Sequence, residues 1–319
     1  MVLPGIEALQ AAAEIVRGVL PPTPQIHWPL ISARAGAEVW IKHENHTPLG
    51  AFKLRGGLVY MERLRQREPT VTGVIAATRG NHGQSIAYTA ARAGLRAVLV
   101  VPRGNSCEKN AAMRAMGAEL IEHGDDFQEA YEYAAAVSEM QGLHFVRSFD
   151  AELVCGVASY ALELFGAVQD LDAVYVPIGL GSGICGTIAA RDALGLRTEV
   201  IGVVAAHAPA YALSFAAGAP VAAAVGDTIA DGMACRVADA DALRIILKGA
   251  ARIVTVDEEE ITAAMRHLFS DTHNVAEGAG AAALAALLQE RRHMTSQRVA
   301  LILTGGNVDR DVYARVLAG

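Results

Sequence analysis

The sequence has few of the residues that build disulfide frameworks or cysteine-rich zinc sites. Four cysteines are widely spaced along its 319 residues, and no two of them form a CxxC pair: Cys107, Cys155, Cys185 and Cys235. Such usage excludes a disulfide-stabilised scaffold and is typical of a reducing compartment. We therefore expect a cytoplasmic protein.

Basic clusters and long uncharged apolar runs are missing as well. The formal net charge is −7 and the isoelectric point is about 5.8, so nucleic acid is not an expected partner. The opening segment contains Glu7 and Glu14 without a basic start, which predicts a helix rather than a signal peptide. No uncharged run approaches the roughly 18 residues that span a bilayer, so we expect no membrane partner.

The chain is instead rich in short apolar runs. Hydrophobic residues make up 52% of the sequence, enough for one large domain or two lobes with substantial cores. β-Branched runs predict strands at 73–78, 96–102, 118–123, 173–179, 199–205 and 298–306. Alanine-rich stretches predict helices at 83–94, 108–117, 126–141 and 183–195. This alternation predicts an α/β protein with doubly wound parallel sheets.

The βα units form two series, which predicts two lobes. We expect a large lobe made of residues 1–44 and 146–319, with a small α/β lobe, residues 45–145, inserted between them. Sites in such folds gather where strands end, at their carboxyl termini. Three polar or glycine-rich sequences follow predicted strands, namely ATRGNHGQ (77–84), PIGLGSGICG (177–186) and LTGGN (303–307).

The segment HENHTPLGAFKLRGG, residues 43–57, places Lys53 at the start of an amphipathic helix. A lysine near a helix N-terminus is disfavoured by the helix dipole. One interpretation is a solvated surface lysine. The other is a lysine of lowered pKa that acts as a Schiff-base nucleophile.

The segment PIGLGSGICG matches G-x-G-x-x-G between a predicted strand and a predicted helix. Backbone N–H groups at such a helix start bind anions, most naturally phosphate. The next strand, 199–205, is not followed by the acidic residue that would hold a ribose, so we favour a phosphomonoester over a dinucleotide. Simple close packing by glycines stays an alternative. In LTGGN, Thr304 is either part of a turn or a hydroxyl at the floor of a pocket.

Taken together these segments resemble one family. GAFKLRGG, GNHGQSIA, PIGLGSGICG, IADGMA, EGAGAAAL and LTGGN are similar, in this order, to motifs of the fold-type II pyridoxal-phosphate enzymes, in the branch of threonine dehydratases and serine racemases. The resemblance covers the chain from about residue 20 to residue 310. It implies the tryptophan synthase β-subunit-like fold, pyridoxal 5'-phosphate as cofactor and a homo-oligomer.

The resemblance also implies roles for individual residues that bind the cofactor. Lys53 forms the Schiff base and later removes the α-proton of the substrate, and Phe52 packs beside the cofactor ring. Asn81 binds the phenolic oxygen, and Thr304 faces the pyridine nitrogen. The phosphate is held by Gly179, Leu180, Gly181, Ser182 and Gly183. A neutral hydroxyl at the pyridine nitrogen makes the ring a weaker electron sink, which favours loss of a β-leaving group over transamination.

The same resemblance places the substrate carboxylate on Thr78, Asn81 and His82, although His82 could also be a satisfied loop histidine. Arg79 departs from the family, which has a small residue at this position and, in serine racemases, a serine acid. An arginine cannot shuttle protons, so racemisation is not expected. We hypothesise that Arg79 is a catalytic, cofactor-binding residue that keeps the phenolate ionised. The alternative is an arginine that points outward, to solvent or to a nearby acidic residue.

A second departure concerns metal ions. Val204 and Ala210 stand where the family carries the carboxylates of its divalent cation site. Magnesium and calcium require such oxygen ligands, so we expect no metal site in this chain. A monovalent cation held by backbone carbonyls stays open.

The third departure concerns the substrate. Val157, Ala158 and Ser159 replace a more polar segment of threonine dehydratases, and Gln128 stands roughly where serine racemases carry an arginine. Packing in the core is the alternative for Val157 and Ala158. A less polar pocket suits a hydrophobic β-substituent. The segment KHENHTPLGAFKLRGGLVYMERL most resembles phenylserine dehydratases. We therefore expect an ammonia-lyase that converts L-threo-phenylserine to phenylpyruvate and ammonia.

Other functions stay open at this point. The first alternative is a catabolic L-threonine or L-serine dehydratase, because the chain stops at RVLAG without a regulatory domain. A β-replacing synthase and a serine racemase are further alternatives within the family. A nicotinamide dehydrogenase or a nucleotide-binding module would rest on the G-x-G-x-x-G match alone.

Overall fold

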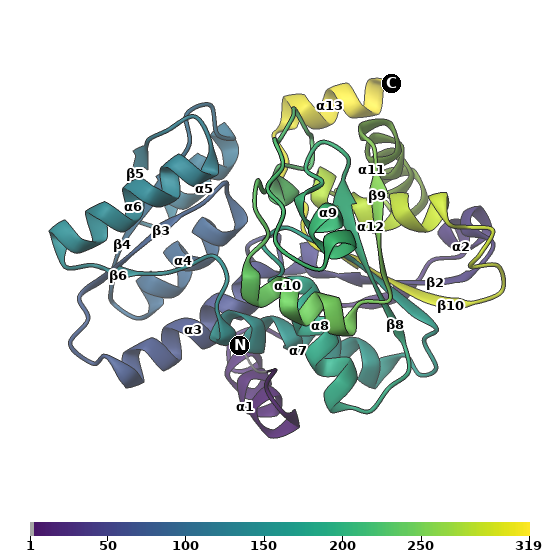
Figure 1. Cartoon of the computed structure of the whole chain (residues 1–319), viewed down its shortest axis with the longest axis horizontal. Helices are drawn as coiled ribbons and strands as arrows, with labels where there is room; N and C mark the ends of the chain where they lie inside the picture. The colour runs from purple at the N-terminus through teal and green to yellow at the C-terminus, as the bar shows by residue number, and fades with distance from the viewer. Residues whose placement is uncertain (1–2) are drawn as a thin grey trace.

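A computed structural model describes residues 3–319 and contains two sheets, each covered by helices (Figure 1). The larger sheet has the strand order β1-β2-β10-β7-β8-β9 and is parallel except for the β1–β2 pair. Its strands are β1 (Gln25–His27), β2 (Glu38–His43), β7 (Ala173–Pro177), β8 (Glu199–Ala205), β9 (Arg252–Val256) and β10 (Arg298–Leu303). The predicted α/β class with parallel sheets is confirmed.

The smaller sheet lies on the left of Figure 1 and has the order β5-β4-β3-β6, with all neighbours parallel. It consists of β3 (Gly73–Ala77), β4 (Arg96–Val101), β5 (Glu119–Glu122) and β6 (His144–Phe145). All six predicted strands are present, whereas β1, β2, β6 and β9 were not predicted. The two-residue β6 is too short to leave a pattern in the sequence. We propose lobe boundaries at residues 44/45 and 145/146.

Helices connect the strands, and those that were predicted are confirmed to within two residues at their starts. The small lobe and its approach contain α3 (Lys53–Arg67), α4 (Asn81–Arg92), α5 (Cys107–Ala115) and α6 (Phe127–Gln141). The remaining α-helices are α1 (Ile6–Arg17), α2 (Pro29–Ala35), α7 (Ala151–Ala167), α8 (Ser182–Ala193), α9 (Ala210–Ala217), α10 (Ala240–Gly249), α11 (Glu258–Thr272), α12 (Gly278–Gln289) and α13 (Arg310–Ala318). Two 3₁₀ turns are η1 (Glu44–His46) and η2 (Asp231–Met233).

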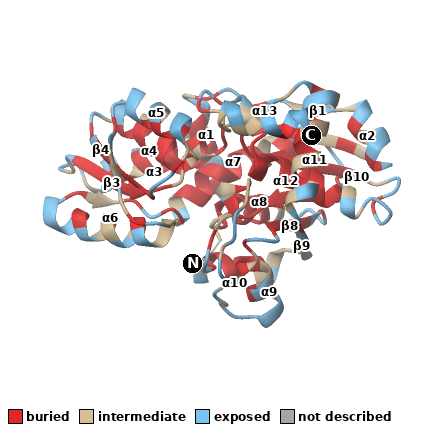
Figure 2. Ribbon diagram, turned by 90° about the horizontal axis from the view of Figure 1, so that it is seen from above, coloured by how far each residue is buried: buried red, intermediate tan, exposed pale blue. Residues whose placement is uncertain are grey.

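The core of the large lobe lies on both faces of its sheet. Alternate strand residues point to opposite faces, so Tyr175 packs with α11 and α12 while Val174 and Val176 pack with α7, α8 and α10. Figure 2 shows that buried residues concentrate in α7, α8 and α12. Both faces of the parallel sheet are thus shielded from water, as its apolar strands require. Within residues 3–319, no helix combines the length and apolarity needed to cross a membrane.

Candidate active site

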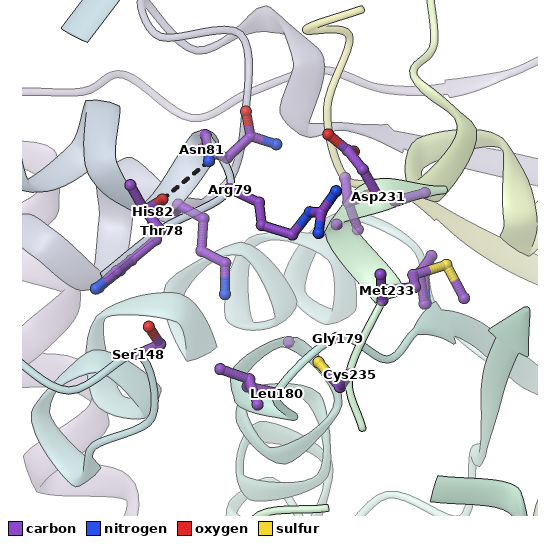
Figure 3. A pocket seen from close by; sticks show the side chains of 18 of the residues that line it. Thr78, Arg79, Asn81, His82, Ser148, Gly179, Leu180, Asp231, Met233 and Cys235 are labelled. Carbon is purple, nitrogen blue, oxygen red and sulfur yellow. Dashed lines mark hydrogen bonds between the residues drawn. The ribbon is translucent and has the colours of Figure 1, made fainter. Parts of the chain in front are cut away.

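A cleft of about 820 Å³ is lined by both lobes, beyond the carboxyl ends of β3, β7 and β10. The structure brings all the predicted site residues to this cleft (Figure 3): Phe52, Lys53, Thr78, Arg79, Asn81, His82, Gly179, Leu180, Gly181, Ser182, Gly183 and Thr304. They come from segments that are far apart in the sequence. Their proximity is what the strand-end rule predicted, while their individual roles stay predictions.

The loop before α3 positions Lys53. The hydroxyl of Thr47 accepts a hydrogen bond from the N–H of Ala51 at 3.0 Å and donates one to the carbonyl oxygen of the same residue. The N–H of Phe52 donates to the carbonyl oxygen of Thr304 at 3.0 Å, which joins this loop to the end of β10. Helix α3 therefore begins at a defined place, with Lys53 at its first position.

The amino group of Lys53 lies inside the cleft and donates a hydrogen bond to the hydroxyl of Ser182 at 3.0 Å. Burial lowers the pKa of Lys53 to about 8, although its interactions with Cys235 and Glu277 oppose the shift. A substantial fraction of the amine is neutral near this pH, and only the neutral amine is a nucleophile. The surface-lysine interpretation is therefore wrong.

The glycine-rich loop between β7 and α8 forms a narrow anion cradle. Gly181 has a φ of +101°, and an added Cβ there would lie 2.7 Å from the Cβ of Ala242. An added Cβ at Gly179 would collide with the carbonyl oxygen of Gly232. The first N–H groups of α8 have no intrahelical acceptor, so they are available to an anion. These residues fit the phosphate of the predicted cofactor, and Lys53 beside Ser182 fits its aldehyde.

Asn81 belongs to a polar network that joins the two lobes. Its side-chain amide donates to Glu277 at 2.6 Å and accepts from Asn307 at 2.8 Å. Glu277 lies 3.2 Å from the ammonium of Lys109, which also contacts Asp231 at 2.7 Å. Burial raises the pKa of Glu277, and the two carboxylates raise the pKa of Lys109. Asp231 and Glu277 lie in the family motifs IADGMA and EGAGAAAL, so their presence at the site could be predicted from the sequence. No motif contains Lys109, so its place in this network could not.

The loop before α4 carries Arg79 and His82. The hydroxyl of Thr78 accepts hydrogen bonds from the N–H groups of Gly80 and Gly83, both at 2.9 Å, which closes the turn. His82 is buried and lines the cleft, and its Nε2 has no partner within residues 3–319. Burial lowers the pKa of His82 to about 3, so the ring is neutral. Arg79 extends into the cleft (Figure 3), so the outward-pointing alternative is wrong.

Three residues used to predict the substrate pocket do not line it. Val157 and Ala158 are buried in the core of the large lobe, against Gly186. The side chain of Gln128 instead donates to Glu132 on α6. The pocket interpretation of Val157 and Ala158 is wrong because helix α7 turns both side chains toward α8, away from the cleft. Phe127 lines the cleft in place of its neighbour Gln128.

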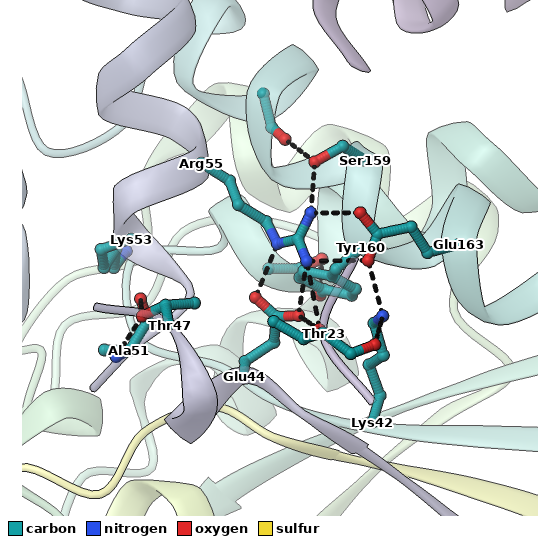
Figure 4. Close-up of polar contacts among 12 residues, drawn as sticks. Thr23, Lys42, Glu44, Thr47, Ala51, Lys53, Arg55, Ser159, Tyr160 and Glu163 are labelled. Carbon is teal, nitrogen blue, oxygen red and sulfur yellow. Dashed lines mark hydrogen bonds and ion pairs between the residues drawn. The ribbon is translucent and has the colours of Figure 1, made fainter. Parts of the chain in front are cut away.

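A buried ionic network lies beneath the start of α3 and was missed by the sequence analysis (Figure 4). Arg55 donates to Glu44 at 2.7 Å and 3.0 Å and to Glu163 at 2.7 Å and 2.8 Å. Lys42 adds a contact of 2.6 Å to Glu163, and Ser159 accepts a hydrogen bond from Arg55 at 3.0 Å. Two cations thus balance two carboxylates, which links β2, η1, α3 and α7.

No group of three or more histidine, cysteine, aspartate or glutamate side chains suited to a metal ion is present in the described part of the chain. Val204, at the position of an expected carboxylate in the family, is buried in β8. Thr304 is buried at the end of β10, where it faces the cleft with a neutral hydroxyl.

Comparisons with known proteins agree with this geometry. Residues 16–305 match the family described as pyridoxal-phosphate dependent enzyme. The L-threonine ammonia-lyase of Thermotoga maritima is 32% identical over 98% of this chain and 78% of its own length. The processed form of threonine deaminase isoform 2 from Solanum lycopersicum superposes with a TM-score of 0.89 at 28% identity, over 99% of this chain and 95% of that chain. Serine racemase from Dictyostelium discoideum gives a TM-score of 0.88 at 26% identity, over 97% and 100%. The chain therefore belongs to the family of pyridoxal-phosphate dependent enzymes, with pyridoxal phosphate as its cofactor, and is a lyase related to the threonine dehydratases.

Proposed function

We propose that this lyase is an ammonia-lyase for small β-hydroxy-α-amino acids, with L-threonine and L-serine as substrates and 2-oxobutanoate or pyruvate and ammonia as products. One observation carries the proposal: Lys53, with a pKa lowered to about 8, lies in the cleft beside the glycine loop. The likeness over 98% of the chain to an L-threonine ammonia-lyase supports these substrates.

Lys53, Asn81, Thr304 and the start of α8 have separate roles in the proposed reaction. When bound, pyridoxal phosphate would supply an electron sink for the substrate Cα, which would favour loss of the α-proton and of the β-hydroxyl. Lys53 accepts that proton on Nζ, because burial lowers its pKa to about 8 and so leaves a substantial fraction of the amine neutral near that pH. The N-terminal turn of α8 holds the phosphate, and Asn81 orients the ring from the small lobe. Thr304 presents a hydroxyl rather than a carboxylate, which suits elimination.

L-threo-Phenylserine is the second candidate substrate. Phe127, Leu180 and Met233 line the cleft and offer apolar surface to a large β-substituent. However, the argument from Val157 and Ala158 is lost, because both side chains lie in the core. We therefore place phenylserine after threonine and serine.

Racemisation and β-replacement are weaker candidates. Position 79 carries an arginine, and an arginine side chain does not serve as a proton shuttle for Cα. D-Serine formed from L-serine, or cysteine formed from O-acetylserine and sulfide, would favour one of these reactions over the proposal.

The test is release of 2-oxo acid from L-threonine, L-serine and L-threo-phenylserine by the purified, cofactor-loaded enzyme. We expect the largest kcat/KM for threonine or serine, no release by Lys53→Ala, and undiminished release by Lys248→Ala on the surface of α10. A clear preference for phenylserine would replace the proposed substrates. Absence of ammonia from all three would overturn the proposal.

A further inference from the structure

Three cations line the cleft, and one of them has no partner. Lys109 is paired with two carboxylates, and the amine of Lys53 is bonded to the hydroxyl of Ser182. Arg79 makes no ion pair or side-chain hydrogen bond within residues 3–319, and its Nε is shielded from solvent. Arg79 is partly buried, so its guanidinium has lost part of its hydration without gaining a counter-charge, which is unfavourable. An anionic ligand would remove that cost.

The cleft holds two helix starts that can bind anions, and Arg79 lies at the second of them. The glycine loop at the start of α8 suits the cofactor phosphate. Arg79 precedes α4, where the N–H groups of Asn81 and His82 have no acceptor within the described residues. The buried Nε2 of His82 also lacks a partner there. A second anion would therefore meet a guanidinium and two backbone donors together.

Arg79 and Lys53 line the same cleft. Burial raises the pKa of the Cys235 thiol to about 12, and the positive charges of both Lys53 and Arg79 oppose that shift. Both cations therefore influence the pKa of the same thiol, which also lines the cleft. An anion bound to Arg79 would therefore share the cleft with the amine of Lys53.

We propose that Arg79 is a specificity residue that binds the α-carboxylate of the amino-acid substrate, together with the N-terminal turn of α4. This inference rests on the proposed function. A planar guanidinium pairs with a carboxylate through two parallel hydrogen bonds, which a turn of neutral N–H groups alone does not provide. The enzyme would thus require a free carboxylate and reject amides and esters of its substrates.

The experiment measures binding rather than turnover. L-Alanine and L-alaninamide lack a β-leaving group, and their dissociation constants are obtained from the absorption change of the cofactor-loaded enzyme. We expect Arg79→Gln to weaken L-alanine binding by roughly 10- to 100-fold, the effect of a charge-assisted hydrogen bond, with little change for L-alaninamide. Arg79→Lys should retain part of the difference. Arg92→Gln, an exposed arginine at the other end of α4, is the matched control.

Two results would overturn the inference. Equal weakening of both ligands would show that Arg79 does not read the carboxylate. A changed absorption spectrum of the Arg79→Gln enzyme before any ligand is added would show that Arg79 acts on the cofactor phenolate instead. Because alanine cannot be dehydrated, this experiment remains decisive even if the wild-type enzyme releases no 2-oxo acid and the proposed function fails.

Discussion

At the scale of the residue, the chemistry of Lys53 follows from its surroundings. An exposed lysine has a pKa near 10.5, whereas burial in the cleft brings that of Lys53 to about 8. Only Cys235 and Glu277 oppose the shift. The cleft thus supplies a neutral amine under conditions in which lysines elsewhere are almost fully protonated.

This pKa predicts a pH dependence for loading the enzyme with its cofactor. Because the neutral amine is the reacting form, the rate at which the apo protein takes up pyridoxal phosphate should rise with pH and level off above about 8. Stopped-flow absorbance of the wild-type protein measures this rate, with Lys53→Ala as the baseline. A rate that keeps rising toward pH 10.5 would mean that Lys53 has the ordinary lysine pKa.

At the scale of the element, the start of α3 is held by Arg55 and its carboxylate partners. The guanidinium is fully buried and bonded to both Glu44 and Glu163. Because α3 begins at Lys53, two residues earlier, this network fixes the direction in which the reactive lysine leaves the backbone. Its hydrogen bonds replace the hydration that the buried charges have lost.

Breaking this network should cost much more than breaking an ion pair on the surface. Arg55→Met leaves two buried carboxylates without their main partner and should lower the free energy of unfolding by about 3–5 kcal/mol. Urea denaturation measures the change. Arg96→Gln removes the exposed pair with Glu119 and should cost less than about 1 kcal/mol. Similar values for the two variants would contradict the stabilising role assigned to Arg55.

At the scale of the whole molecule, the two lobes meet through the carboxylates and amides around Lys109. The ammonium comes from α5 of the small lobe, while Asp231 and Glu277 come from the large lobe. The Asn81–Glu277 hydrogen bond spans the same boundary. The shape of the cleft therefore depends on ion pairs in which one lobe supplies the cation and the other supplies the carboxylates.

Removing this cation should open the cleft. In Lys109→Met, Asp231 and Glu277 repel each other across the space the ammonium filled, so small-angle scattering should give a larger radius of gyration at mildly alkaline pH. Burial already raises the pKa of Glu277, so its protonation at mildly acidic pH should restore the compact form. Lys248→Met, on α10, is the control. An unchanged radius at both pH values would show that the ion pairs do not hold the lobes together.

The sequence alone determined the class of fold, the family, the cofactor and the residues that meet in the cleft. Strands such as β3 and β7 are continuous apolar runs, which reveal themselves locally because parallel strands are buried on both faces. Lys53 and the glycine loop were predictable because a helix start and a tight anion cradle each require particular residues at fixed spacing.

Only the tertiary structure decided which side chains surround those residues. Helix α7 buries Val157 and Ala158 rather than exposing them to substrate, while Phe127 reaches the cleft from α6. Lys109 contacts Asp231 from 122 residues away in the chain. The lowered pKa of Lys53 and the unpaired charge of Arg79 are likewise properties of the folded protein. Burial and charge pairing depend on distances through space, and the local sequence patterns that specify strands and turns do not encode those distances.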